Sequence, residues 1–152
     1  MKVKAGEDHV LLRAGALRLL VPQSQISQIR HFNRIDLQGT EVIVTQEQLA
    51  RNIEEKKEGL VFLSENLGIL TRADLQRFVY TSWQIAPAVQ WCWTEVLFVG
   101  QEFEEVSDIP GVLQIKRSPF SAIVTLKNQR YAFLCDVRRL IDYVISTRGV
   151  LL

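Results

Sequence analysis

The N-terminal part of the chain alternates apolar and polar residues in the pattern of a β-hairpin. Residues 9–13 and 17–21 are two apolar runs, and Gly15 lies in the short turn between them. In the second run, one face of the expected strand carries Leu17, Leu19 and Val21. Arg18 and Leu20 point the other way, so we expect the first face to meet a core. Beyond this run, Ile26 and Ile29 are spaced to keep contact with the core through a short turn or helical segment.

Two central segments carry the start signal of a helix. The first is a capping box that begins at Thr45, which predicts a helix to about Lys57 that Gly59 ends. A similar signal at Thr71 is followed by apolar residues at helical spacing, which predicts a second helix up to Trp83. Short strands are expected at residues 60–63 and 95–106, the latter with a kink at Gly100.

The stretch from Pro110 to Tyr143 is the most organised part of the sequence. It contains alternating or apolar runs that predict a strand at 112–117 and a hairpin made of 122–127 and 130–135. The period then changes, because five residues share one helical stripe: Val137, Leu140, Ile141, Val144 and Ile145. This pattern predicts a closing helix over residues 137–146. Asp136, Arg138 and Arg139 lie where the strand gives way to that helix, and we expect them to position it.

Three tryptophans, Trp83, Trp91 and Trp93, gather in a segment that Pro87 interrupts. Tryptophan is enriched both in protein interiors and at interfaces. The region is therefore interpreted as a core, as a subunit contact that closes a homodimer, or as a small-ligand pocket, and the sequence leaves these alternatives open.

Length and composition predict one domain over residues 1–152. The chain is 47% hydrophobic and 23% charged, as in ordinary globular proteins. Its net charge of only +1 argues against a dedicated nucleic-acid binder. Cys92 and Cys135 lack metal-site or disulfide spacing, which favours reduced thiols in a cytoplasmic protein. No apolar run approaches the roughly 18 residues of a membrane span, so we expect no membrane insertion.

Candidate catalytic groups are few, and none has the spacing that its chemistry requires. His9 and His31 belong to no triad or ligand pattern, and Cys92 has no sequence neighbour that would stabilise a thiolate. Glu104 and Glu105 are adjacent and would point to opposite faces of a strand. The sequence therefore favours a non-enzymatic role, and we expect no cofactor and no metal.

The two hairpins also resemble each other at a fixed offset of 114 positions. Leu19 matches Phe133, Leu20 matches Leu134, and Ile26 matches Leu140. These matches indicate a domain with two related β-rich halves.

Three segments resemble the CheW-like chemotaxis coupling proteins. They are residues 17–22 followed by Ile26 and Ile29, residues 111–116, and residues 121–136 with Asp136 at the family's aspartate. The resemblance implies a β-rich α+β fold of two pseudo-symmetric small barrels, here with two to three helices. It also implies a non-catalytic signalling adaptor that bridges a histidine kinase to chemoreceptors.

The chain departs from that family where Lys116 and Arg117 replace an arginine and a glycine. Lysine cannot make the bidentate contacts of arginine, which puts that contact in doubt. The residues that we predict to bind a protein partner are Val21, Ile26, Ile29, Trp91, Trp93, Lys116, Arg117, Arg138 and Arg139.

Overall fold

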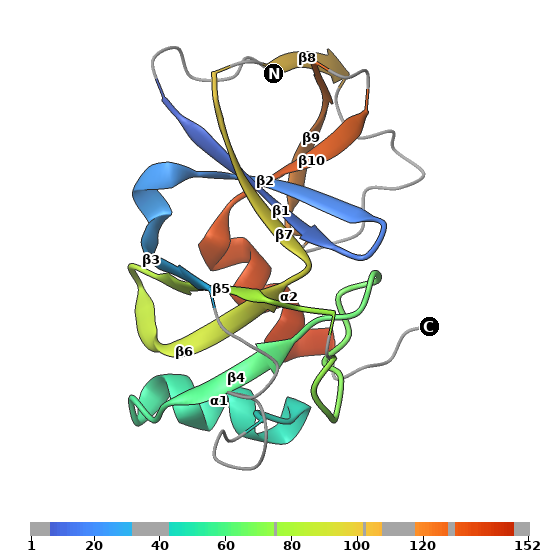
Figure 1. Cartoon of the computed structure of the whole chain (residues 1–152). Helices are drawn as coiled ribbons and strands as arrows, with labels where there is room; N and C mark the ends of the chain where they lie inside the picture. Colours follow the sequence, from blue (N-terminus) through green and yellow to red (C-terminus); the bar gives the residue numbers. More distant parts are fainter. Residues whose placement is uncertain are drawn as a thin grey trace.

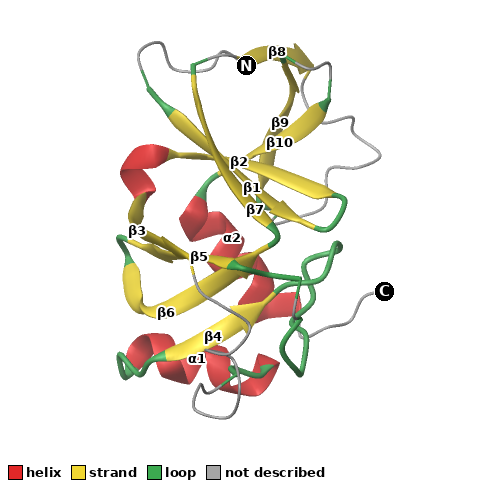
Figure 2. Ribbon diagram, viewed as in Figure 1, coloured by secondary structure: helices red, strands yellow, loops and turns green. Residues whose placement is uncertain are grey.

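Ten β-strands and two α-helices make up the described part of the chain in the computed structural model. That part comprises residues 7–31, 43–74, 76–101, 103–107, 118–127 and 130–147. Strands predominate (Figure 2), so the fold is β-rich and of the α+β class, as predicted. The strands form one six-stranded and one four-stranded sheet, which lie in the upper and lower halves of Figure 1.

The six-stranded sheet has the order β7-β1-β2-β10-β9-β8. Its strands are β1 His9–Ala14, β2 Leu17–Pro22, β7 Glu95–Gly100, β8 Phe103–Ser107, β9 Phe120–Leu126 and β10 Tyr131–Cys135. The four-stranded sheet has the order β3-β5-β6-β4, with β3 Ile26–His31, β4 Gly59–Phe62, β5 Val79–Trp83 and β6 Ala86–Trp93. The helices are α1 Gln46–Glu54 and α2 Val137–Thr147, and a single 3-10 turn, η1 Gln23–Gln25, joins the sheets.

Both predicted hairpins form, and both belong to the six-stranded sheet. β1 pairs antiparallel with β2, and β9 pairs antiparallel with β10. The hairpins meet where β2 runs parallel to β10, with Leu19 beside Phe133 and Leu20 beside Leu134. Each of these two neighbouring pairs is separated by 114 positions in sequence, the spacing at which the two hairpins resemble each other. The two hairpins therefore do not divide between the two sheets.

The six-stranded sheet buries apolar side chains on both of its faces. On one face, Leu12, Leu19 and Val21 belong to the main core, which continues into the four-stranded sheet and both helices. On the other face, Leu11, Leu20 and Leu134 belong to a second core whose described members all come from this sheet. Both edge strands contribute to the second core, through Val99 of β7 and Phe103 of β8, so the sheet curls around it. Leu20 is thus fully buried, although the sequence placed it on the face away from the core.

The three tryptophans lie in the main core. Trp83, Trp91 and Trp93 each have 0% exposed surface, and the Trp83 ring lies 5.9 Å from that of Trp91 and 6.3 Å from that of Trp93. The Trp93 indole donates a hydrogen bond of 3.0 Å to the Thr81 hydroxyl. The core interpretation of this segment is therefore right. A side chain without exposed surface reaches neither a second subunit nor a ligand from solvent.

α2 closes the main core, as the apolar stripe predicts. Val137, Leu140, Ile141 and Val144 are all buried there. The helix packs alongside both sheets, and α1 lies at the lower end of the molecule (Figure 1). At that end the Gln46 side chain of α1 donates to the Val144 carbonyl of α2, at 2.7 Å. α2 thereby contacts the main core shared by both sheets and also bonds to α1.

The second predicted helix, from Thr71 to Trp83, is wrong. Its end is strand β5, which pairs with β3 and β6, and the other described residues of the segment contain no helix. The strand VYTSW is rich in β-branched and aromatic residues, which suit a pleated, buried surface. Tertiary pairing therefore overrides the helical spacing.

Smaller corrections concern where elements end. α1 has the predicted Thr45 capping box, but it ends at Glu54 rather than near Lys57. The left-handed residue after it is Lys56, with φ 56°, and Gly59 begins β4. Pro87 lies inside β6 instead of closing a segment. The strand predicted at 112–117 lies outside the described residues.

Replacing Gly15 tests how tightly the first hairpin turn is held. Gly15 has φ +62°, and a Cβ there would overlap the Glu65 carboxylate, which accepts a hydrogen bond from the Ala16 amide at 2.8 Å. We expect Gly15→Ala to lower the free energy of unfolding by at least about 1–2 kcal/mol, measured by urea denaturation. Gly68→Ala is the control, because a Cβ there would lie 3.3 Å from the Ser64 hydroxyl and the backbone needs no positive φ. Equal losses in both variants would contradict this account.

Candidate partner-binding site

A pocket of about 360 Å³ lies where the two sheets and α2 meet. Three segments line it: the η1 turn, the turn between β5 and β6, and the start of α2. The lining residues are Ser24, Gln25, Gln84, Ile85, Asp136, Val137 and Arg138. The site is therefore built from segments that are more than 50 positions apart in sequence but are brought together by the sheets.

Gln25 and Asp136 hold the floor of this pocket rigidly. The Gln25 side chain donates to Asp136 Oδ1 and accepts from the Val137 amide, both at 2.8 Å. Asp136 Oδ2 accepts from the Arg139 amide at 3.1 Å, which is the geometry of a helix N-cap. Asp136 thus positions the closing helix, as the sequence indicated. Because these oxygens already satisfy first-turn amides, the helix start is not an open anion site.

The pocket lining includes one exposed apolar side chain and one exposed cationic side chain. Ile85 is 47% exposed at the tip of the β5–β6 turn, and Arg138 is exposed on α2. The turn is fixed to η1, since the backbone N–H of Gln84 donates to the backbone carbonyl of Gln25 at 2.9 Å. Gln84 Nε2 also donates to the Ile26 carbonyl at 3.3 Å. An exposed isoleucine on a fixed turn, in a pocket that an arginine also lines, is suited to contact another protein.

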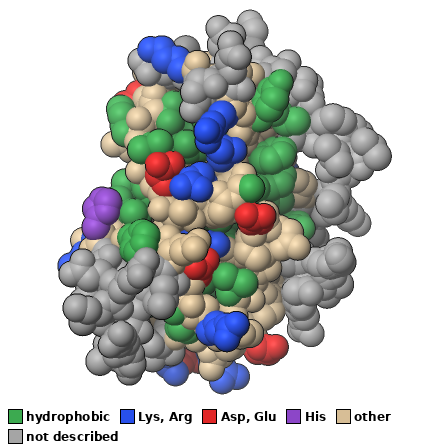
Figure 3. Space-filling model, turned by 45° about the vertical axis from the view of Figure 1, so that its right-hand side comes forward, with side chains coloured by type: hydrophobic (Ala, Val, Ile, Leu, Met, Phe, Trp, Pro, Cys, Tyr) green, Lys and Arg blue, Asp and Glu red, His purple; other side chains and the backbone are tan. Residues whose placement is uncertain are grey.

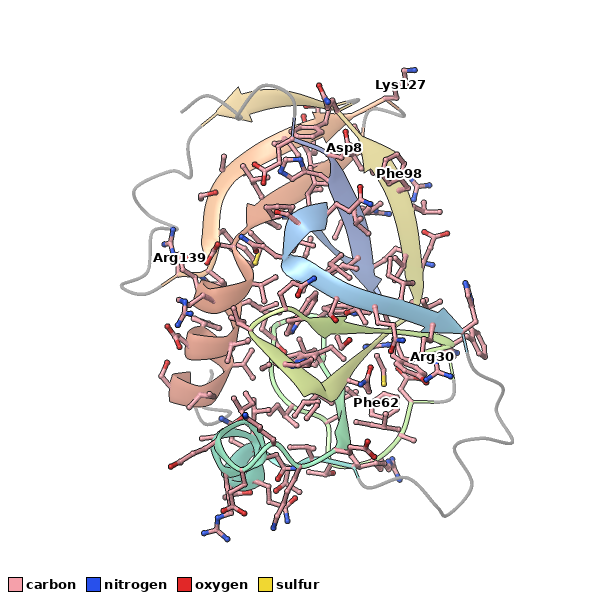
Figure 4. The ribbon with its side chains drawn as sticks, turned by 90° about the vertical axis from the view of Figure 1, so that its left-hand side faces the viewer. Asp8, Arg30, Phe62, Phe98, Lys127 and Arg139 are labelled. Carbon is pink, nitrogen blue, oxygen red and sulfur yellow. The ribbon has the colours of Figure 1, made fainter. Side chains whose placement is uncertain are left out.

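Arg139 has a structural role on the same helix turn. One of its guanidinium nitrogens donates to the Ser118 carbonyl at 2.6 Å, which ties α2 to the segment before β9. Figure 4 shows Arg139 at the upper end of α2, where the helix begins. The sequence predicted that this arginine positions the helix, and the hydrogen bond is consistent with that role.

The nine predicted partner-binding residues fall into three groups. Val21, Trp91 and Trp93 have 0% exposed surface in the main core, so their predicted contact with a partner is corrected to a packing role. Lys116 and Arg117 lie outside the described residues. Of the remaining four, Arg138 lines the pocket, Arg139 follows it on α2, and the Ile26 carbonyl accepts a hydrogen bond from Gln84 of the pocket lining. Ile29 lies farther along β3, where it pairs with Thr81.

Ile26 and Ile29 differ from their expectation. Both belong to strand β3 rather than to a turn or helical segment. Ile26 is buried in the main core, as predicted, whereas Ile29 is 44% exposed, so its predicted core contact is wrong. The pairing of β3 with β5 shifts register between Ile26 and Gln28, and every residue of β3 after Ile26 is exposed, so only the first residue of this strand reaches the core.

Sequence reasoning missed the pocket residues Gln25, Gln84 and Ile85. Gln25 stands outside any recognisable motif, and its partner Asp136 is 111 positions away. Gln84 and Ile85 form a two-residue hairpin turn, yet they carry none of the glycine, asparagine or aspartate that normally marks one. Only the β5–β6 pairing reveals that Ile85 is a turn residue.

Three potentially reactive side chains outside the pocket, those of Cys92, Cys135 and His9, are buried. Burial raises the pKa of the Cys135 thiol far above its ordinary range, and the nearby Asp136 adds to this effect. Cys92 is also buried. His9 packs edge-on against Phe103, and burial lowers its pKa, which favours the neutral ring. The described residues contain no group of three or more potential metal ligands.

Neither of the two described helices is long and apolar enough to cross a membrane. No protein-family model matches the sequence, and no curated protein matches it.

Removing the Gln25 side chain tests the floor of the pocket. Gln25→Ala deletes two hydrogen bonds that join η1 to α2, so we expect it to lower the free energy of unfolding by about 2 kcal/mol. The neighbouring Gln23 is exposed, and Gln23→Ala is the matched control. Chemical denaturation measures both, and a Gln25 variant as stable as the control would refute the bridging role.

The two thiols are expected to be inert in the folded protein. Only a thiolate attacks a disulfide reagent, and burial disfavours the thiolate at Cys135. We expect Ellman's reagent to titrate neither Cys92 nor Cys135 at pH 8 until denaturant is added. Rapid reaction of either thiol in the native protein, assigned by Cys→Ser variants, would contradict this burial.

Proposed function

We propose that the protein is a non-catalytic adaptor that binds a protein partner at the rim of the junction pocket. The observation that carries the proposal is the exposed Ile85, whose turn is hydrogen-bonded to η1 and which lines the same pocket as Arg138. Binding interfaces combine an aromatic or aliphatic anchor with a polar rim, and they are most precise when rigid elements support the anchor. Gln25 and Gln84 supply that support through their hydrogen bonds.

The resemblance to CheW-like coupling proteins supports a signalling partner. In that family a domain of two small barrels bridges a histidine kinase to chemoreceptors, and this chain has two sheets joined at the pocket. We therefore propose a kinase or a receptor of that type as the partner. The inertness expected of both thiols is consistent with a binding role.

Placing a photo-crosslinker at residue 85 tests where the partner binds. We expect p-benzoylphenylalanine at Ile85 to capture a kinase or receptor in cells, identified by mass spectrometry. The same group at Leu97, which is 46% exposed on β7, is the control and should not capture that protein. With the captured partner purified, we expect Ile85→Glu to weaken binding at least about tenfold in calorimetry.

Two results would refute the proposal. One is the absence of any adduct at residue 85 other than with the chain itself. The other is equal affinity of the Ile85→Glu and wild-type proteins for the captured partner, once circular dichroism shows both to be folded.

A further inference from the structure

Strand β7 forms an open edge of the six-stranded sheet. Among the described strands it pairs only with β1, so the backbone groups of its other side have no strand partner there. Leu97 is 46% exposed and Phe98 is 66% exposed, the largest exposure among the large hydrophobic side chains of the described residues. Figure 4 shows Phe98 on β7 at the outer edge of the sheet. An edge of this kind is a template for another extended strand.

The register of β7 places apolar side chains on both faces of this edge. Phe98 lies beside Val10 and Val96 beside Leu12, on the face of the main core. Leu97 lies beside Leu11, on the face of the second core. A strand added to β7 would therefore extend both cores at once. The strand has none of the lysine or proline residues that usually protect a sheet edge.

The charges around β7 are compatible with a second copy of the same surface. The only charged residue of the strand is Glu95, and Arg13 neutralises it through an ion pair of 3.2 Å. The net charge of the whole chain is only +1. On the face seen in Figure 3, acidic and basic side chains are interspersed. Two copies would therefore meet without strong electrostatic repulsion.

A bulge determines which residues of β7 can pair. Between His9 and Val10 the register shifts by one extra residue, Val99, and Gly100 adopts φ +67°. The regular part of the strand is thus Glu95–Phe98. A two-fold axis perpendicular to the sheet must pair one residue with its own copy in the second chain. If that residue is Leu97, Val96 of each chain lies opposite Phe98 of the other, within the regular part of the strand.

We propose that β7 pairs antiparallel with β7 of a second copy of this chain, centred on Leu97, and so joins the two six-stranded sheets. In this pairing each Leu97 faces its copy, and each Phe98 lies against Val96 of the other chain. The two-fold axis keeps the main-core faces on one side of the joined sheet. The contact is short, so we expect a reversible dimer with a dissociation constant in the micromolar to millimolar range.

Sedimentation velocity from about 1 µM to about 1 mM tests the dimer. We expect the wild-type mass to rise with concentration toward twice that of the monomer. Leu97→Lys and Phe98→Lys should each raise the dissociation constant at least tenfold. Ile29→Lys and Ile85→Lys are matched controls, because their side chains are 44% and 47% exposed on other elements, and they should leave self-association unchanged.

Engineered cysteines test the register. Residues opposite each other in an antiparallel pair have Cα atoms about 4.5–5.5 Å apart, within reach of a disulfide. We expect Leu97→Cys to give a covalent dimer on mild oxidation and Phe98→Cys to give none, because the two Phe98 positions are offset along the strands. The native Cys92 and Cys135 are buried and should not interfere.

A wild-type protein that stays monomeric at 1 mM would overturn the proposal. So would a dimer that tolerates both lysine variants, or covalent trapping at position 98 rather than 97. If the dimer proposal fails, the adaptor proposal stands, because it depends on Ile85 and not on β7. Loss of partner binding in Ile85→Glu would likewise leave the dimer unaffected.

Discussion

The six-stranded sheet is apolar on both faces, and the rest of the fold follows from the need to cover them. The parallel neighbours β2 and β10 lie at its centre, where Leu19 faces one core and Leu20 the other. Within the described residues the second core is enclosed by the curl of the sheet, since both edge strands reach it. The main core needs other elements, which are α1, α2 and the tryptophan-bearing face of the four-stranded sheet.

This covering brings η1, the β5–β6 turn and the start of α2 to one place, and the proposed binding site is a consequence of it. The Gln25 side chain bridges η1 to the start of α2, so the hydrogen bonds that stabilise the junction of the sheets also fix the lining of the pocket. Recognition there needs an exposed apolar anchor and a charged neighbour, which Ile85 and Arg138 provide. No bond-breaking group is required for that role.

The curl leaves β7 as an edge whose apolar side chains are only partly covered. Burying Leu97 and Phe98 further would continue the same two cores into a second chain. The proposed dimer and the proposed partner site use different elements, so self-association and partner binding can be separated by single substitutions. A protein with both would present its partner sites in pairs.

The sequence by itself determined the elements whose signals are local. Both hairpins, the capped start of α1 and the stripe of α2 were predicted because turn residues, caps and side-chain period act over a few positions. Only the tertiary structure decided that β5 is a strand, that both hairpins share a sheet, that Leu20 is buried and that Ile85 is exposed in the pocket that Arg138 lines. These properties depend on contacts between segments up to about a hundred positions apart, and such contacts leave no periodic trace in either segment alone.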